Sequence, residues 1–373
     1  MISAVKMTTY IETIPDPRTF RCSHRCVDVI TIALLAKICG ADGWEDMHEF
    51  GRSRQDWLGT FLELPAGIPS PDTFRRIISH VEPNAFLEAF LDWSKAVRSA
   101  ISGLINIDGK TLRSTLREGG NPIHIVSAWC EANHMILGQL RNESKSNEIT
   151  AIPELLKQLT LAEGCIITID AAGTQKENAR LIREAKADYV LAVKGNQPKL
   201  RDELENYFLQ AAEAGGEYAL LNEFVTEEKK HGRLELRKVY ATDDLDWLPL
   251  REEWKDLRSI AKVESIRWAN GERGQEIRYY ISSMSADAER LGKAIRGHWG
   301  VENQCHWVLD VVFGEDQSTI TEGHAPENLR TINLMAAKML KEEKTCKKGI
   351  RAKQFKAALD NVYLHRVLSV MNF

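Results

Sequence analysis

The spacing of apolar residues changes near residue 103 and divides the chain into two parts. Up to about Ser102 the apolar positions follow helical spacing, with almost no alternation of apolar and polar residues. The helices that this spacing predicts cover Val27–Cys39, Trp44–Phe61, Asp72–His80 and Asn84–Ile101. We therefore expect residues 1–102 to form a helical N-terminal domain.

Short apolar runs separated by turn residues replace the helical spacing after residue 103. The first predicted strands are Leu104–Asp108, Ile123–Cys130 and Met135–Leu140, with turns at Gly119-Gly120 and Ala132-Asn133. A helix, a strand, a helix and a strand follow, over Glu148–Leu161, Cys165–Asp170, Lys176–Lys186 and Tyr189–Lys194. This order predicts an α/β fold in which helices flank a mixed sheet.

The alternation is interrupted between residues 198 and 284. One helical stretch, Leu200–Ala214, is followed by strand patterns over Leu234–Ala241, Ser259–Arg267 and Ile277–Ser283. We interpret this segment as a mainly β insertion in a domain that spans residues 103–373. A helix with Ser285 as its N-cap is expected to run to about Val312. Two C-terminal helices are expected around Glu327–Leu340 and Ala352–Val370.

Composition and charge are those of a globular protein without an overall basic character. Of the 373 residues, 43% are hydrophobic and 27% are charged, and the net charge is −4. Any surface that binds nucleic acid must therefore be local. One basic stretch, Lys338–Lys356, holds eight Lys or Arg against two Glu, although a solvated helix face would look the same.

Nothing in the sequence predicts export or a membrane span. The start of the chain has no charged segment followed by an apolar one. The longest apolar run, Val27–Ala41, contains Asp28 and Lys37 and is shorter than the roughly 20 residues that a spanning helix needs. Seven scattered cysteines fit a reducing compartment. We expect a cytoplasmic protein.

Two features of the N-terminal part have alternative interpretations. Cys22, His24 and Cys26 could begin a zinc site, but no second ligand pair follows at a suitable spacing. The segment Pro69–Thr73 is a helix-start signal, and the helix after it carries Arg75 and Arg76. This arrangement is typical of a DNA recognition helix, and equally of an ordinary helix pair with exposed arginines.

Two aspartates follow apolar strands. Asp108 comes directly after Ile105-Asn106-Ile107, and Asp170 comes after Ile166-Ile167-Thr168-Ile169, so each is expected at the carboxyl end of its strand. Open sheets place their ligands in the crevice at these ends. A turn-forming role would explain either aspartate alone, but it explains the two together less well.

A third carboxylate lies in the helix predicted after the insertion. On a regular helix His298, Glu302 and His306 share one face, while Trp299, Leu309 and Val312 can face the sheet. Asp310 continues the polar column as a weaker candidate. A satisfied polar stripe is the alternative.

Three carboxylates suit one kind of chemistry in particular. Phosphodiester cleavage needs an activated oxygen nucleophile and neutralisation of the charge that develops, and two hard cations about 3.5–4 Å apart supply both. Mg²⁺ prefers carboxylate oxygens and keeps several of its waters. The hypothesis is therefore that Asp108, Asp170 and Glu302 are catalytic residues that hold two Mg²⁺ or Mn²⁺ ions.

From about residue 103 to about residue 316 the chain resembles the DDE transposases of bacterial insertion sequences, most closely the H-repeat-associated transposase family. The motifs that carry the resemblance are Ile107-Asp108-Gly109-Lys110, Ile169-Asp170-Ala171 with Gln175, Val193-Lys194-Gly195-Asn196-Gln197, and His298-Trp299-Gly300-Val301-Glu302-Asn303 with His306-Trp307-Val308-Leu309-Asp310. The first hundred residues resemble the helical segment that accompanies this family.

The resemblance implies a ribonuclease-H-like fold with a β insertion before the glutamate helix. It also implies metal-dependent DNA strand cleavage and strand transfer. The expected partners are element ends bearing inverted repeats and target DNA, with a homodimer in the DNA complex. When bound to DNA, the protein is expected to be associated with the nucleoid. The residues expected to contact DNA are Lys110, Arg113, Gln175, Lys194, Arg296, His298, His306, Arg75 and Arg76.

One departure from related families and two rival functions stay open. Many insertion-sequence transposases carry Tyr, Arg and Lys at set distances from the glutamate, where this chain has Ile295, His298 and Leu309. This puts part of the DNA contact in doubt. One rival is an inactive or domesticated transposase that only binds DNA. The other is a zinc hydrolase with His298, Glu302 and His306 as ligands.

Overall fold

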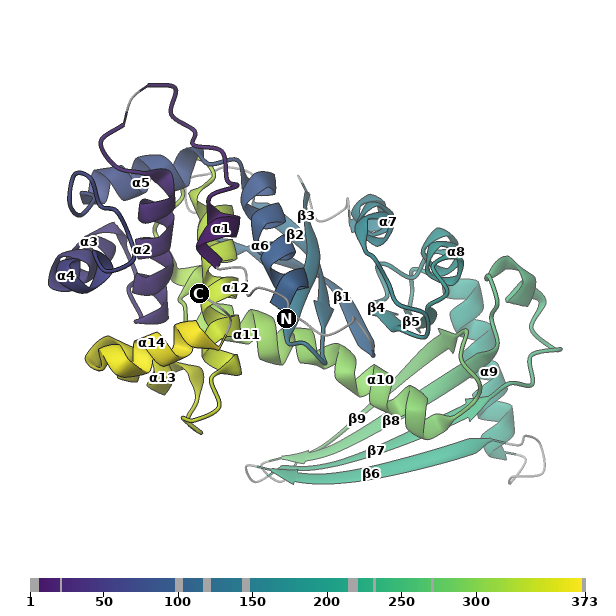
Figure 1. Cartoon of the computed structure of the whole chain (residues 1–373). Helices are drawn as coiled ribbons and strands as arrows, with labels where there is room; N and C mark the ends of the chain where they lie inside the picture. The colour runs from purple at the N-terminus through teal and green to yellow at the C-terminus, as the bar shows by residue number, and fades with distance from the viewer. Residues whose placement is uncertain are drawn as a thin grey trace, which may run out of the picture.

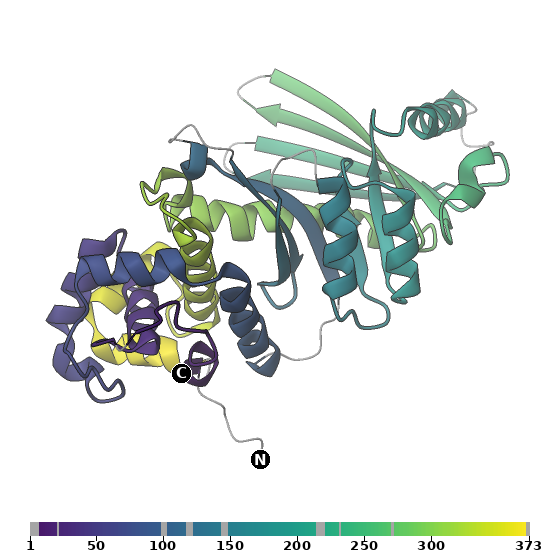
Figure 2. The same cartoon turned by 90° about the horizontal axis from the view of Figure 1, so that it is seen from above.

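The computed structural model of the chain describes residues 7–20, 22–97, 103–116, 122–142, 148–213, 221–230, 233–269 and 272–370. Helices gather on one side of the molecule and a large sheet extends on the other (Figures 1 and 2). The turn expected at Gly119-Gly120 lies outside the described residues. Across the described part of the chain, no helix has both the length and the apolar character needed to cross a lipid bilayer.

The N-terminal part is helical, as expected. Its described helices are α1 (Met7–Ile11), α2 (Cys26–Ile38), α3 (Trp44–Ser53), α4 (Gln55–Leu58), α5 (Pro71–His80) and α6 (Pro83–Val97). The single helix expected over 44–61 is wrong, because Arg54 leaves the helical region with φ −127° and ψ 20°. At α5 the Ser70 hydroxyl accepts a hydrogen bond from the backbone N–H of Thr73, and Pro71 occupies the first turn.

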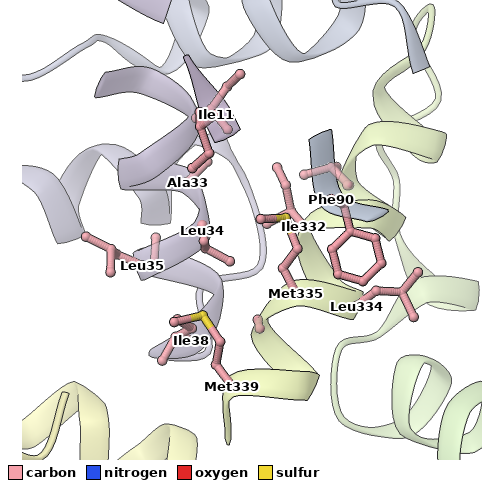
Figure 3. Packing of buried hydrophobic residues seen from close by; sticks show 14 of the residues in the cluster. Ile11, Ala33, Leu34, Leu35, Ile38, Phe90, Ile332, Leu334, Met335 and Met339 are labelled. Atoms are coloured by element: carbon pink, nitrogen blue, oxygen red, sulfur yellow. The ribbon is translucent and has the colours of Figure 1, made fainter. Parts of the chain in front are cut away.

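The C-terminal helices pack into this helical group. They are α12 (Ala325–Glu342), α13 (Ile350–Leu359) and α14 (Asn361–Ser369). One apolar core joins α2 and α6 to α12, and Figure 3 shows Leu34, Phe90 and Met335 among its side chains. The helix expected over 352–370 is divided in two because the Asp360 carboxylate accepts backbone N–H groups of α14 as its N-cap. Since both chain ends share this core, the domain boundary at 102/103 stays a prediction.

The expected mixed α/β sheet is confirmed. Its first strands are β1 (Leu104–Leu112), β2 (Ile123–Cys130), β3 (Met135–Asn142), β4 (Ile166–Ile169) and β5 (Asp188–Val193). They lie in the order β3-β2-β1-β4-β5, with β2 antiparallel to β1, and with β1, β4 and β5 parallel to one another. This is a ribonuclease-H-like arrangement, as the resemblance implies.

The mainly β insertion extends this sheet. It begins with α9 (Pro198–Glu213) and continues with β6 (Asn222–Lys230), β7 (Arg233–Thr242), β8 (Ser259–Ala269) and β9 (Glu272–Ser282). The last of these strands, β9, pairs antiparallel with β5, so that the described strands form one nine-stranded sheet ending in β6 (Figure 1). Residues of the insertion therefore lie next to the parallel strands.

Helices cover both faces of the sheet. Helices α7 (Glu148–Gln158) and α8 (Lys176–Glu184), together with α9, pack against the face that carries Ile105 and Ile107. On the other face α10 (Ala288–Val301) runs across the strands (Figure 1). Its N-cap is Asp287, whose carboxylate accepts the N–H of Arg290, so the expected cap at Ser285 is wrong. The helix then changes form: Glu302–His306 is a π-helical turn, followed by α11 (Trp307–Val311).

Candidate active site

Alternation along the strands gathers polar residues on the α10 face of the sheet. Side chains two residues apart on a strand point to the same face. Asn106 donates a hydrogen bond to the backbone of α10, so Asp108 shares that face, and Thr168 places Asp170 there in the same way. A cavity of about 180 Å³ lies between these strands and α10. Its lining includes Asp108, Asp170, Glu302, Thr168, Lys194, Arg278, His298 and Trp299.

The position of Asp108 differs in detail from the expectation. It does not end its strand, because β1 continues to Leu112 through antiparallel pairing with β2. The parallel pairing with β4 stops at Ile107 and Ile169. Asp108 and Asp170 therefore follow the same rung of the parallel pair, which is why both face the cavity although only one of them leaves its strand.

A close contact between α10 and β1 fixes the third carboxylate. A Cβ on Gly297 would lie 2.2 Å from Leu104 Cδ2 and 2.8 Å from Glu131 Oε2, so a larger residue here would force both side chains to move. The Asn106 amide donates to the Gly297 carbonyl over 2.9 Å. Glu302 follows five residues later and begins the π-helical turn. Single π turns inside helices are frequent at functional sites.

Burial and neighbouring negative charge perturb Asp108. Burial, followed by the charges of Asp170 and Glu302, raises the pKa of Asp108 to about 7. Glu148 at the start of α7 adds a smaller effect in the same direction, whereas the backbone N–H of Gly109 lowers this pKa. Perturbed carboxyl groups in clefts are typical of functional sites. This cleft thus holds more negative charge than its surroundings neutralise.

His298 is partly buried, and its surroundings favour the neutral imidazole. Thr168 donates its hydroxyl proton to Asn106 Oδ1 over 2.7 Å, so it accepts the Nδ1–H of His298 at 2.9 Å. Burial, with a further effect of Arg278, lowers the pKa of His298 to about 4. A neutral imidazole that holds α10 against β4 cannot serve as a phosphate-binding cation, which counts against its expected contact with DNA.

His306 is also buried and neutral. Its Nδ1 lies 3.6 Å from Asp108 Oδ2, and its Nε2 has no hydrogen-bond partner among the described residues. Burial, followed by the charges of Arg330 and Lys110, lowers the pKa of His306 well below its usual value. Between Glu302 and His306 the helix has π form in place of the regular α form that the sequence predicted.

Lys110 is engaged in a buried group of charges that we call the Lys110 cluster. Its members are Lys110, Asp310, Glu315, Asp316 and Arg330. The Lys110 ammonium binds Asp310 and lies 2.9 Å from Glu315, and the fully buried Arg330 lies 2.6 Å from the same Glu315 oxygen. With only 9% of its side chain exposed, Lys110 is not available to phosphate in this arrangement.

Among the other expected DNA contacts, Lys194 is exposed and lines the cavity. Arg113 is 76% exposed and lies 3.8 Å from Asp316. Arg296 pairs with Glu228 at 3.2 Å, and the Gln175 amide lies 3.5 Å from the Ala172 carbonyl. On α5, Arg75 binds Asp72 and Glu322, whereas Arg76 is 65% exposed and lies 3.2 Å from Asp72. These exposed arginines stay candidates for DNA contact.

No ready-made metal cage is present among the described residues: no group of three His, Cys, Asp or Glu is placed to hold one ion. This counts against zinc at His298, Glu302 and His306, and against zinc at the described Cys22, His24 and Cys26, because catalytic and structural zinc need three or four protein ligands on one ion. The expectation of Mg²⁺ depends less on such a cage, since Mg²⁺ keeps several waters and takes one or two carboxylates.

Sequence reasoning missed two residues of this cleft, Thr168 and Arg278. The period of two places Thr168 on the same face as Asp170, so the sequence held that signal. Arg278 reaches the cleft only because β9 pairs with β5, which brings together residues that are far apart in the chain. No local sequence pattern predicts the pairing of these two strands.

Two family models match the chain. The model described as "DDE_Tnp_1-associated" matches residues 8–94, and the model described as "Transposase DDE domain" matches residues 104–338. The second match spans all the residues that line the cleft.

Relatives match nearly the whole chain. It is 39% identical to "Putative transposase YncI" of Escherichia coli O157:H7, over 99% of this chain and 95% of that one. It is also 39% identical to "H repeat-associated putative transposase YhhI" of Escherichia coli (strain K12), over 98% of both chains. Among solved structures, the piggyBac transposase synaptic complex with hairpin DNA aligns with a TM-score of 0.45 and 11% identity, over 98% of this chain and 76% of that one.

Proposed function

The chain belongs to the DDE transposase family, and from this premise we propose that it cuts and joins DNA at the cleft between β1, β4 and α10. The substrate would be the ends of an insertion-sequence-like element, together with a target DNA. The observation that carries the proposal is the meeting of Asp108, Asp170 and Glu302 on one cavity, with the pKa of Asp108 raised to about 7.

The donor set fits hard divalent cations. All three candidate ligands offer carboxylate oxygens, which Mg²⁺ and Mn²⁺ prefer, and the raised pKa of Asp108 shows negative charge that a cation would neutralise. We propose that Asp108, Asp170 and Glu302 would together hold two such ions. When bound, such ions activate the attacking oxygen and stabilise the charge that develops on the phosphate.

The reaction takes place in two transfers. In the first, a water oxygen forms a bond to phosphorus and the bond to the 3′ oxygen breaks, which leaves a free 3′ hydroxyl on the element. In the second, that hydroxyl oxygen attacks a phosphorus of target DNA and displaces its 3′ oxygen, which leaves with a proton. The exposed Lys194 at the edge of the cleft is placed to meet the phosphate.

We also propose that the protein acts as a homodimer on DNA, with one copy for each of the two element ends. Light scattering of the protein mixed with end DNA measures the mass of this complex.

The test is a nicking assay on duplexes that contain the inverted repeats flanking the reading frame. Wild-type protein should cut them with Mg²⁺ or Mn²⁺ and not with EDTA. Asp108→Asn should bind the same duplex, measured by gel shift, without cutting it, because the substitution removes a charge without adding bulk. Binding without cutting by the wild-type protein would overturn the proposal in favour of a DNA-binding protein.

A further inference from the structure

A cation of the insertion lines the same cleft as the three carboxylates. Val193 of β5 pairs with Tyr279 of β9, so Lys194 and Arg278 are the next residues on the two neighbouring strands. Arg278 shares its sheet face with Tyr280, which packs in the core under α10. Both cations line the same cavity as Asp108, Asp170 and Glu302.

The Arg278 side chain is held from two sides. Its guanidinium lies over the Trp299 ring of α10 at 4.9 Å from the centroid, and its Nε donates to Glu276 at 2.8 Å. Only 25% of the side chain is exposed. The guanidinium also makes a side-chain hydrogen bond with Tyr280. Stacking on an aromatic ring restricts a guanidinium to a plane, and the N–H groups that Glu276 and Tyr280 do not use can bind an anion. Little conformational entropy would then be lost when it binds an anion.

The surroundings of Arg278 favour its protonated, positively charged form. Burial acts to lower its pKa, but the hydrogen bond and charge of Glu276 and the nearby Tyr280 leave the pKa above its ordinary value. Glu276 is half exposed, with 48% of its side chain accessible, so water weakens the attraction between its carboxylate and the Arg278 guanidinium. Arg278 thus offers positive charge where three carboxylates would repel a phosphodiester.

We propose that Arg278 binds the non-bridging oxygens of the phosphate that is cut, and is a catalytic residue supplied by the insertion. This inference rests on the proposed function. The lining of the cavity combines carboxylates from β1, β4 and α10 with Lys194, which follows β5, and Arg278 of β9. Of the two cations Arg278 has the planar fork that matches phosphate, whereas lysine acts as a point charge.

Cleavage rates of three variants test the assignment. Arg278→Ala should cut end DNA about 100-fold more slowly, the loss typical of removing one preorganised donor from a transition state. Arg278→Lys, which keeps the charge without the fork, should lose about 10-fold. The matched control is Arg273→Ala, on the exposed part of the same strand and away from the cleft, which should stay within about twofold. A rate for Arg278→Ala within threefold of wild type would overturn the inference.

A binding measurement separates contact from folding effects. A duplex whose cleaved phosphate is replaced by a neutral methylphosphonate is bound to wild type and to Arg278→Lys and Arg278→Ala, in EDTA so that nothing is cut. Wild type should bind the normal duplex more tightly than Arg278→Ala does. If Arg278 touches this phosphate, that ratio of affinities should be about fivefold smaller on the neutral duplex, because the substitution and the methylphosphonate remove the same interaction. An unchanged ratio overturns the inference alone. Failure of wild type to cut any duplex with Mg²⁺ or Mn²⁺ overturns the proposed function instead.

Discussion

Asp108 and Lys110 stand two residues apart on the same face of β1, yet their surroundings are opposite. Asp108 lies in a cleft with two further carboxylates, and its pKa is raised to about 7. Lys110 lies in the Lys110 cluster, where the Glu315 side chain is only 6% exposed, against 18% for Asp108. Burial alone would raise the pKa of Glu315, but Arg330 and Lys110 hold it below its usual value. Along one strand, the acids around Lys110 are paired with buried cations, whereas the closest charges that affect Asp108 are other acids.

The difference shows which buried charges serve the fold. A buried carboxylate with hydrogen-bonded cations has its desolvation cost offset within the protein, and it fixes the elements that carry it. Here the Lys110 cluster fastens β1 to the segment after α11 and to α12. A buried carboxylate without such partners costs stability and is retained only where something else binds it. The predictions below test this distinction.

The largest expected effect is on the cleavage rate, which should depend strongly on Glu302 and only weakly on Asp310 in the same helical region. Glu302→Gln should lower the cleavage rate by more than about 1000-fold, since it removes a ligand of the reacting centre. Asp310→Asn, two turns further on, should cost less than about 10-fold because Asp310 only binds Lys110. Single-turnover rates on end DNA measure both. If Asp310→Asn were the more damaging change, the two groups of acids would have been assigned the wrong way round.

The Lys110 cluster should show its effect in stability. Arg330→Met leaves the fully buried Glu315 with Lys110 as its remaining cation, and removing one partner of a buried pair costs about 3–5 kcal/mol. Urea unfolding gives the free energy of unfolding. The double variant Arg330→Met with Glu315→Gln should be destabilised by clearly less than the sum of the two single variants. Additive losses would show that the pair does not act as a unit.

Asp108 should behave in the opposite way, because its ionised form is disfavoured in the fold. Its folded pKa of about 7 exceeds the unfolded value of 3.8, so wild type loses stability as pH rises between these values. In EDTA, Asp108→Asn should therefore be more stable than wild type by up to about 4 kcal/mol at pH 8, and by little at pH 4. Unfolding curves at the two values measure this. A destabilised Asp108→Asn at pH 8 would mean that the Asp108 charge is already compensated.

The sequence was sufficient for the features that depend on local pattern. Apolar strands ending in an acid located Asp108 and Asp170, and the spacing after the insertion located the helix of Glu302. It was insufficient where distant segments decide. The polar residues after Asp108 continue β1 only because β2 pairs with them, and Lys110 is buried by Asp310, two hundred residues away. The π turn at Glu302–His306 has no sequence rule that distinguishes it from a regular helix.

The smallest effect compares two lysines that the sequence assigned to DNA in the same way. Each phosphate contact adds about 0.9 to the slope of log affinity against log salt concentration. Lys194 is exposed at the edge of the cleft, so Lys194→Ala should reduce this slope by about one unit and weaken binding to all sequences alike.

Lys110 is only 9% exposed and already bound by acids, so Lys110→Met should leave the slope unchanged in folded protein, even though it lowers stability. Titrations of end DNA between about 50 and 200 mM salt, the range in which phosphate contacts alter affinity strongly, measure both slopes. Equal reductions for the two variants would mean that DNA opens the Lys110 cluster on binding. In that case the contrast between the surroundings of Asp108 and Lys110 would describe the free protein alone.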